Sequence, residues 1–138
     1  MTIQAATPYL ILNGRAREAI ALYEKALGAK VELLQTFGDV DGSCPAARRD
    51  LVMHCELRFG DTRLLLSDST GPGELPQGGL ISIALQLDDP DEARRVFEVL
   101  AGSGKAIEKL FEAPWGALFG IAADAFGVGW MFNAALKK

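Results

Sequence analysis

EAIALYE at residues 18–24 recurs as EARRVFE at residues 92–98. Both stretches carry, in the same order, a glutamate, an alanine, an aliphatic residue, an aromatic ring and a second glutamate. With one inserted residue, Lys30 in turn corresponds to Lys105. An ordered set of matches at a fixed spacing indicates a duplicated unit. The sequence therefore predicts two similar modules in tandem.

A run of turn-forming residues separates the two copies. Residues 71–79, GPGELPQGG, combine glycine and proline, which interrupt helices and strands. We expect a linker there, between a first module over residues 1–70 and a second module over residues 80–138. A chain of 138 residues is long enough for two small modules that together form one compact fold.

Each copy contains an amphipathic helix. Apolar residues recur every three to four positions, which places them on one helical stripe. Asp89 followed by Pro90 is a helix-start signal, and we expect Gly28 and Gly102 to end the two helices. The stripes consist of Ala16, Ala19, Ile20, Tyr23 and Leu27 in the first module and of Ala93, Val96, Phe97 and Leu100 in the second.

Short apolar or alternating stretches flank both helices and predict β-strands. One strand precedes each helix and three follow it, so each module has the order β-α-β-β-β and the fold class is α+β. The predicted strands cover residues 9–13, 31–37, 51–59 and 63–68 in the first module and residues 80–87, 107–112, 118–123 and 129–134 in the second.

Alternation along the strands divides their side chains between two faces. In residues 51–59 we expect the odd-numbered side chains to pack under the helix and the even-numbered ones to face away from it. The face away from the helices is too polar for a core and too apolar for a plain solvated surface, so it suits a ligand cavity or a subunit interface. A solvated sheet face is the alternative. The candidate ligand-binding residues are His54, Glu56, Ser67, Ser82, Gln86, Trp115, Met131 and Asn133.

Charge and hydropathy exclude several classes of protein. The net charge is −4 and no run of lysine or arginine occurs, so we expect no nucleic acid as a partner. No stretch of about 18 apolar residues is present, so we expect no membrane span. A basic segment followed by an apolar stretch is missing after Met1, and we expect a cytoplasmic protein.

The module order and the local motifs resemble the vicinal oxygen chelate superfamily, which includes glyoxalase I, bleomycin-resistance proteins and fosfomycin-resistance enzymes. The similarity is greatest to its PhnB-like branch, with departures at Pro114 and Gly116. The resemblance implies a curved mixed sheet around a cup and a homodimer. The motifs that carry it are residues 8–10, 13–20, 27–28, 37–39, 53–54, 67–68, 119–120, 126–128 and 130–133, together with Tyr23, Trp115 and Asp124.

The resemblance also implies a divalent metal held by histidine and glutamate at set strand positions. In this sequence those positions fall on Pro8, on Ser82 or Ile83, and on Met131. Proline has no ligating side-chain atom, and a thioether selects soft ions. We therefore expect no metal in the usual position and no cofactor. A displaced site that uses His54 and Glu56 stays open.

The leading hypothesis is a protein that binds a small, partly apolar molecule without a catalytic metal. The alternative is a lyase or isomerase that uses His54 and Glu56 as acid and base, with or without a displaced metal. A dimer with a vestigial cup is a third reading. The branch often carries a 3-demethylubiquinone methyltransferase label, but Gly14 stands alone after the first predicted strand. A glycine-rich cofactor loop is therefore missing, and we do not expect methyltransferase activity.

Overall fold

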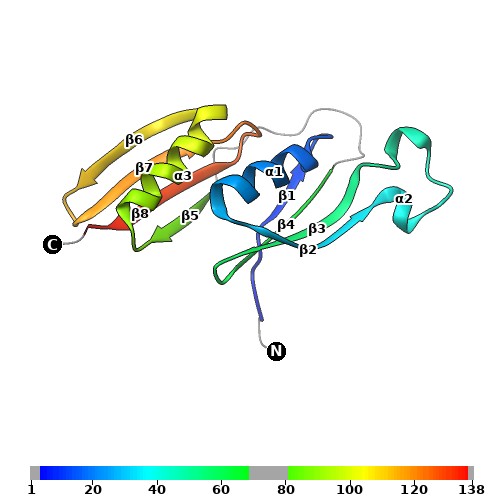
Figure 1. Ribbon diagram of the computed structural model, residues 1–138, viewed down its shortest axis with the longest axis horizontal. Helices are drawn as coiled ribbons and strands as arrows, with labels where there is room; N and C mark the ends of the chain where they lie inside the picture. The colour runs from blue at the N-terminus through cyan, green and yellow to red at the C-terminus, as the bar shows by residue number, and fades with distance from the viewer. Residues whose placement is uncertain (1–3, 69–80, 137–138) are drawn as a thin grey trace. The chain divides into compact units, whose positions relative to one another are not determined.

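The structure is a computed structural model, and it describes residues 4–68 and 81–136. The chain divides into two compact units, and each described range belongs to one of them (Figure 1). The linker expected at residues 71–79 lies outside the described residues. None of the helices in the described ranges combines the length and the apolar character that crossing a membrane requires.

The first module has one helix and four strands. Strand β1 (Tyr9–Leu12) leads into helix α1 (Ala16–Leu27), and strands β2 (Lys30–Thr36), β3 (Val52–Phe59) and β4 (Thr62–Asp68) follow. The sheet order is β1-β4-β3-β2. Strand β1 runs parallel to β4, and the other neighbours are antiparallel. This is the predicted β-α-β-β-β order.

The second module repeats this path. Strand β5 (Ser82–Leu87) precedes helix α3 (Pro90–Ser103), and strands β6 (Lys105–Ala113), β7 (Ala117–Ala123) and β8 (Gly129–Ala135) follow. Its sheet order, β5-β8-β7-β6, has the same parallel pair at one edge. The prediction of two βαβββ modules is confirmed. The cup that both modules would form together stays a prediction.

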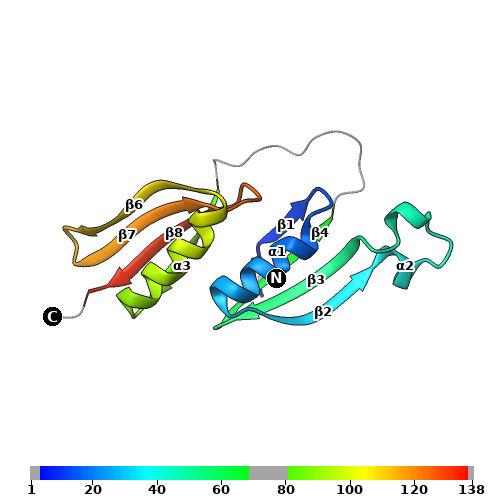
Figure 2. The ribbon, with the colours of Figure 1, turned by 45° about the horizontal axis from the view of Figure 1, so that its top comes forward.

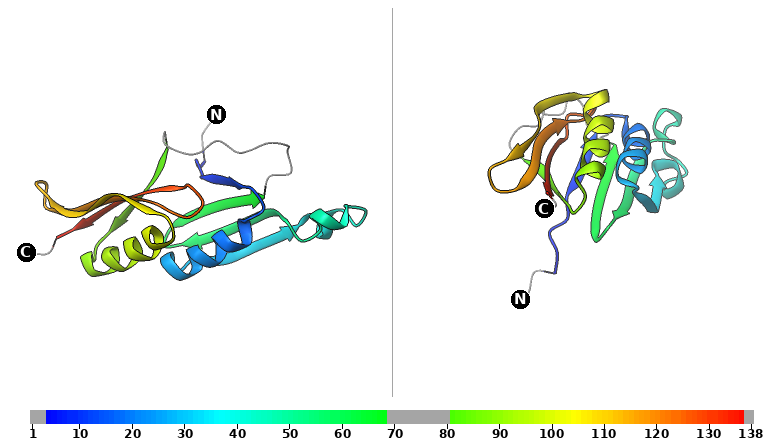
Figure 3. Two further views of the ribbon diagram at one scale, coloured as in Figure 1. Left: turned by 90° about the horizontal axis from the view of Figure 1, so that it is seen from above. Right: turned by 60° about the vertical axis from the view of Figure 1, so that its left-hand side comes forward.

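Each helix covers one face of its own sheet (Figures 2 and 3). Tyr23 of α1 is fully buried and Phe97 of α3 is 8% exposed, so both repeat aromatics lie in a core as expected. Phe97 packs edge-to-face on Phe132 of β8, with ring centroids 5.3 Å apart. At the end of the first stripe, Ala26 is buried in place of Leu27. We call the face of each sheet that is turned away from its helix the open face.

The two helices begin by different means. Helix α3 starts as predicted, since the Asp89 carboxylate accepts a hydrogen bond of 3.0 Å from the backbone N–H of Asp91. Helix α1 has no cap from its own preceding residue. Instead Asp68, at the end of β4, accepts from the backbone N–H of Ala16 at 2.9 Å and from that of Val52 at 3.0 Å. This buried carboxylate compensates the positive end of α1 and ties it to β3 and β4.

The two helices also end differently. Gly28 ends α1 in the left-handed conformation, with φ at +66°, as the sequence predicts. The prediction that Gly102 ends the second helix is wrong, because α3 continues to Ser103 and Gly104 follows it. A Cβ on Gly104 would lie 2.0 Å from the carbonyl oxygen of Ala123, so only glycine fits this close approach.

Strand β3 departs from simple alternation near its start. Cys55 and Leu57 are buried under α1 as predicted, but Val52 is also fully buried and Met53 is only half-buried. The cause is a shift in pairing with β2, where Gln35 pairs with His54 and Thr36 already pairs with Val52. Met53 is the extra residue, and such a bulge reverses the side-chain parity on one side of it.

The connection between β2 and β3 contains local structure that the sequence analysis did not predict. The strand expected over residues 31–37 ends at Thr36, where α2 (Phe37–Val40) begins. The Thr36 hydroxyl accepts from the Asp39 backbone N–H at 3.0 Å, and the Asp39 carboxylate accepts from the Thr36 backbone N–H at 3.1 Å. This reciprocal cap stops the strand. A 3-10 turn over Ala46–Arg48 follows.

Candidate functional site

Strand register determines which side chains share the open face of the first module. Residues that pair directly across a sheet point to the same side of it. Glu56 of β3 pairs with Leu65 of β4, and Leu65 also pairs with Tyr9 of β1. Leu64 and Leu66, on either side of Leu65, are fully buried under α1. Tyr9, Glu56 and Leu65 therefore lie on the open face.

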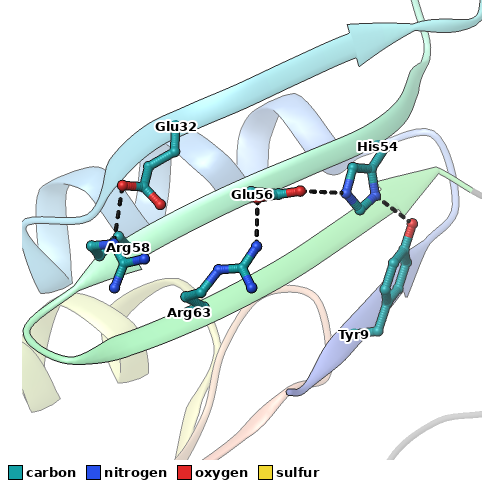
Figure 4. Close-up of polar contacts among 6 residues, drawn as sticks. All are labelled: Tyr9, Glu32, His54, Glu56, Arg58 and Arg63. Carbon is teal, nitrogen blue, oxygen red and sulfur yellow. Dashed lines mark hydrogen bonds and ion pairs between the residues drawn. The ribbon is translucent and has the colours of Figure 1, made fainter. Parts of the chain in front are cut away.

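Four side chains form a continuous hydrogen-bonded row on this face (Figure 4). The Tyr9 hydroxyl lies 3.1 Å from Nδ1 of His54, and Nε2 of His54 lies 3.1 Å from Oε2 of Glu56. Nη2 of Arg63 donates to Oε1 of Glu56 at 2.6 Å. We call Tyr9, His54, Glu56 and Arg63 the polar row. It joins β1, β3 and β4 through side chains alone.

The charge on Glu56 fixes where the protons of the polar row lie. The hydrogen bond from His54, followed by that from Arg63, holds the pKa of the Glu56 carboxyl below its usual range. An ionised carboxylate only accepts hydrogen bonds. Nε2 of a neutral His54 must therefore carry the ring proton, which leaves Nδ1 to accept from the Tyr9 hydroxyl.

The same face carries a second ion pair that Figure 4 shows apart from the polar row. Nε of Arg58 donates to Glu32 at 3.0 Å, and both side chains are more than 40% exposed. Exposed pairs of this kind contribute little to stability. Ser67 alternates with the helix-facing Leu66 and Asp68, so it shares the open face, but it is 9% exposed and lies beside Ile11 in the register.

The open face of the second module is aromatic. Phe111 on β6, Trp115 in the following turn and Phe119 on β7 stack edge-to-face, with centroids 6.0 Å and 5.5 Å apart. Trp115 is 61% exposed, and its indole N–H donates to Oδ1 of Asn133 at 3.0 Å. We call Phe111, Trp115 and Phe119 the aromatic cluster. One hydrogen bond thus holds a large, solvent-facing ring in place.

Three predicted site residues lie on this same face. In the register, Phe119 pairs with Asn133, and Asn133 pairs with Gln86 of β5. Met131 lies two positions before Asn133, between the fully buried Trp130 and Phe132, and therefore faces away from α3. The structure thus brings Gln86, Trp115, Met131 and Asn133 to the open face of the second module.

Ser82 lies apart from these residues, at the other end of β5. It pairs with Gly129 and lines an open cavity of about 620 Å³ beside the turn between β7 and β8. Asp124 organises that turn. Its carboxylate accepts from the backbone N–H groups of Phe126 and Val128 at 2.9 Å and 3.1 Å. It also accepts from the buried indole of Trp130 at 2.9 Å, which the sequence analysis missed.

Two members of the polar row, Tyr9 and Arg63, and two of the aromatic cluster, Phe111 and Phe119, were not among the predicted site residues. Tyr9 alternates with Leu10, so strand parity places it on one face, but its contact with His54 depends on β1 lying parallel to β4. Arg63 reaches Glu56 across the β3–β4 hairpin. Phe111 follows a register irregularity in the pairing of β6 with β7. In each case the missing information is strand pairing.

The residues present do not fit the divalent metal that the resemblance implies. Pro8 and Met131 offer no hard ligand at two of the implied positions. For a displaced site, both ring nitrogens of His54 and both carboxylate oxygens of Glu56 are already hydrogen-bonded. Within residues 4–68 and 81–136, no three histidine, cysteine, aspartate or glutamate side chains gather closely enough to hold an ion.

Comparison with known proteins gives one family. The model of the Glyoxalase/Bleomycin resistance protein/Dioxygenase superfamily matches residues 6–132. Protein YjdN of Escherichia coli strain K12 is 30% identical over 142 residues, which cover 96% of each chain. Among solved structures, protein PA1353 from Pseudomonas aeruginosa is 37% identical with a TM-score of 0.85, and the match covers 99% of this chain and 100% of that one. The PhnB protein from Bacillus cereus shares the fold, with 22% identity and a TM-score of 0.82, and the match covers 96% of this chain and 100% of that one.

Proposed function

The chain belongs to the Glyoxalase/Bleomycin resistance protein/Dioxygenase superfamily, and from that premise we propose that it binds a small, partly apolar molecule without a catalytic metal. The observation that carries the proposal is the aromatic cluster. Clusters of exposed apolar side chains often mark binding sites, and a ring that is already held in one orientation loses less freedom when a ligand binds. Trp115 combines these two properties.

The open face of the second module offers the two kinds of contact that such a ligand needs. An aromatic ring that covers about 100 Å² of apolar surface gains about 2.5 kcal/mol from burial, and edge-to-face contacts add to it. Gln86 and Asn133 lie beside the cluster and supply amide groups for a polar substituent. Because Asn133 already fixes the indole, little side-chain entropy is lost on binding.

We extend the proposal to the assembly state, a homodimer, since members of this superfamily complete their cups with paired modules. Two exposed apolar side chains on the edge strands of the first sheet, Ile11 on β1 and Val31 on β2, support a contact with the second copy of the chain at these edges. Closed two-fold dimers are the commonest homo-oligomers.

Native mass spectrometry of freshly purified protein tests both parts of this proposal. We expect a mass of two chains, no stoichiometric metal and a bound organic molecule of constant mass. Trp115→Ala should lose that molecule, whereas Val40→Ala, which removes an exposed apolar side chain from the first module, should keep it. Retention by Trp115→Ala, or one metal per chain that disappears in His54→Ala, would overturn the proposal.

A second candidate function is supported by a different observation. Nε2 of His54 lies 3.1 Å from Oε2 of Glu56, the distance expected of two side chains that act together as acid and base. This contact supports the alternative proposal, a lyase or isomerase that works through His54 and Glu56. Turnover of the copurified molecule separates the two candidates, since a binding protein releases it unchanged. A displaced metal would raise the melting temperature when Zn²⁺, Ni²⁺, Mn²⁺ or Co²⁺ is added, because an ion that binds only the folded state stabilises it.

A further inference from the structure

The open face of the second module carries a further feature, the open cavity beside Ser82, which lies outside the aromatic cluster. We propose that the cavity and the cluster form one site, and that its ligand is an elongated molecule with an aromatic ring at one end and a carboxylate at the other. The ring lies at Trp115, and the carboxylate lies between Ser82 and Lys105. This inference rests on the proposed function and names the chemical class of its ligand.

Strand pairing arranges the side chains of this face in three rungs, each of which crosses all four strands. The first rung consists of Ser82, Gly129, Ala123 and Lys105, the second of Ala84, Met131, Ile121 and Glu108, and the third of Gln86, Asn133, Phe119 and Phe111. A strand advances about 3.3 Å per residue, so the first and third rungs lie about 13 Å apart. A ligand that contacts both ends of this face must therefore be elongated.

The first rung is hollow because its two central residues are small. Gly129 on β8 and Ala123 on β7 both line the cavity, whose volume is about 620 Å³. A Cβ on Gly129 would lie 2.8 Å from the hydroxyl oxygen of Ser82, so the absence of this atom leaves room for that hydroxyl over β8. A cavity of several hundred cubic ångströms is typical of small-molecule sites.

Lys105 supplies a positive charge on the other side of this hollow. It pairs with Ala123, lines the same cavity and is exposed. None of the ion pairs in the described part of the chain uses Lys105. The Asp124 carboxylate also lines the cavity, but two N–H groups of its turn and the indole of Trp130 already donate to it. A carboxylate of the ligand can accept from the Ser82 hydroxyl and the Lys105 ammonium.

The middle of the face suits an aliphatic chain. Met131 and Ile121 pair directly in the second rung, and the exposed side chains of Ile81 and Ile107 continue the apolar surface around the cavity. Methylene groups gain free energy when they cover such a surface. Glu108 lies at the exposed edge of the second rung and repels a negative charge there, which favours a carboxylate at the end of the ligand.

A matched pair of compounds tests this assignment: 6-phenylhexanoate and its neutral amide, 6-phenylhexanamide. In ¹H–¹⁵N spectra the indole signal of Trp115 reports on the ring, and the backbone signals of Ala123 and Gly129 report on the other end. We expect the acid to shift all three signals and to bind about tenfold more tightly than the amide. This is a modest gain for a hydrogen bond to a charged group, because Lys105 is exposed.

Variants assign the preference to one side chain. Lys105→Gln should abolish the preference for the acid, whereas Lys105→Arg should retain it. Lys109→Gln, on the same strand but outside the cavity, should match the wild type. The spectrum of each variant also shows whether it is folded.

Three results would overturn this inference while leaving ring binding at Trp115 in place. They are equal affinities for the acid and the amide, a preference for the acid that survives in folded Lys105→Gln, and tighter binding of 6-phenylhexylamine, which the carboxylates of Asp124 and Glu108 would attract. A Trp115 signal that responds to none of the compounds would overturn the proposed function together with this inference, so the two failures are distinguishable.

Discussion

The sheet of the first module presents four hydrogen-bonded polar side chains on its open face, whereas the sheet of the second presents three stacked aromatic rings. Their helix-facing sides are alike, since Tyr23 and Phe97 occupy matching positions and both are buried. The difference indicates that core packing has kept one face of the duplicated sheet similar. The open face is free of that constraint, and its two copies now carry different chemistry.

The helix starts show a second contrast. Helix α3 is capped by Asp89, the residue that precedes it, whereas α1 is capped by Asp68 from the far end of the module. A local cap stabilises its own helix. A cap from β4 stabilises α1 only when the whole module is folded, so the start of the first module depends more strongly on tertiary structure.

The contrast between the two faces predicts the largest effect on stability. Phe97→Ala should lower the free energy of unfolding by about 3–5 kcal/mol, the usual loss for a buried aromatic ring. Phe111→Ala, on the open face and 40% exposed, should cost about 1 kcal/mol or less. Urea denaturation of both variants measures the difference. Equal losses would show that the open face is as tightly packed as the core.

The contrast between the two caps predicts a smaller effect. Asp68→Ala leaves the backbone N–H groups of Ala16 and Val52 without their buried acceptor, which should cost about 2–4 kcal/mol. Asp89→Ala should cost about 1 kcal/mol, as for an exposed helix cap. The same denaturation experiment applies. A larger loss from Asp89→Ala would contradict the assignment of Asp68 as the cap of α1.

The polar row predicts a pH effect that should be smaller still. Because the folded-state pKa of Glu56 is lowered by His54 and Arg63, its stabilising contribution is present above the ordinary glutamate range and is lost as pH falls through the lowered value. The wild type should therefore exceed Glu56→Gln in stability at neutral pH, and the two should converge in acid. Thermal melts from pH 7 to pH 3 test this. A constant difference would mean that Glu56 is not held as a carboxylate by its neighbours.

Local signals in the sequence were sufficient for the fold. The repeated helix motif, the Asp89–Pro90 start and the alternation in the strands predicted the β-α-β-β-β order of both modules, and this prediction is confirmed. The resemblance of the local motifs to the superfamily is confirmed as well. The prediction that Gly102 ends the second helix was wrong, because the sequence alone does not distinguish Gly102 from Gly104 as the residue that ends it. What decides between them is how closely Gly104 approaches β7.

Long-range pairing explains what the sequence could not predict about the site. His54 and Glu56 were identified from their spacing on one strand, and the structure places them in contact. Tyr9 and Arg63 come from other strands, and only the β1–β4 and β3–β4 registers bring them to that pair. Val52 was assigned to the wrong face, since a bulge is not visible in a pattern of alternating residues.

We propose that the aromatic cluster of the second module binds a small, partly apolar molecule without a metal, and the two tryptophan side chains allow a direct test. The chain has two tryptophans, Trp115 on the open face and Trp130 in the core, so its ¹H–¹⁵N spectrum should contain two indole signals. Titration with a set of small planar aromatic compounds, in the presence of EDTA, should shift the Trp115 signal with a saturable dependence and leave that of Trp130 in place. A Trp115 signal that no compound moves, or that moves only after Zn²⁺ or Ni²⁺ replaces the EDTA, would contradict metal-free binding at this cluster.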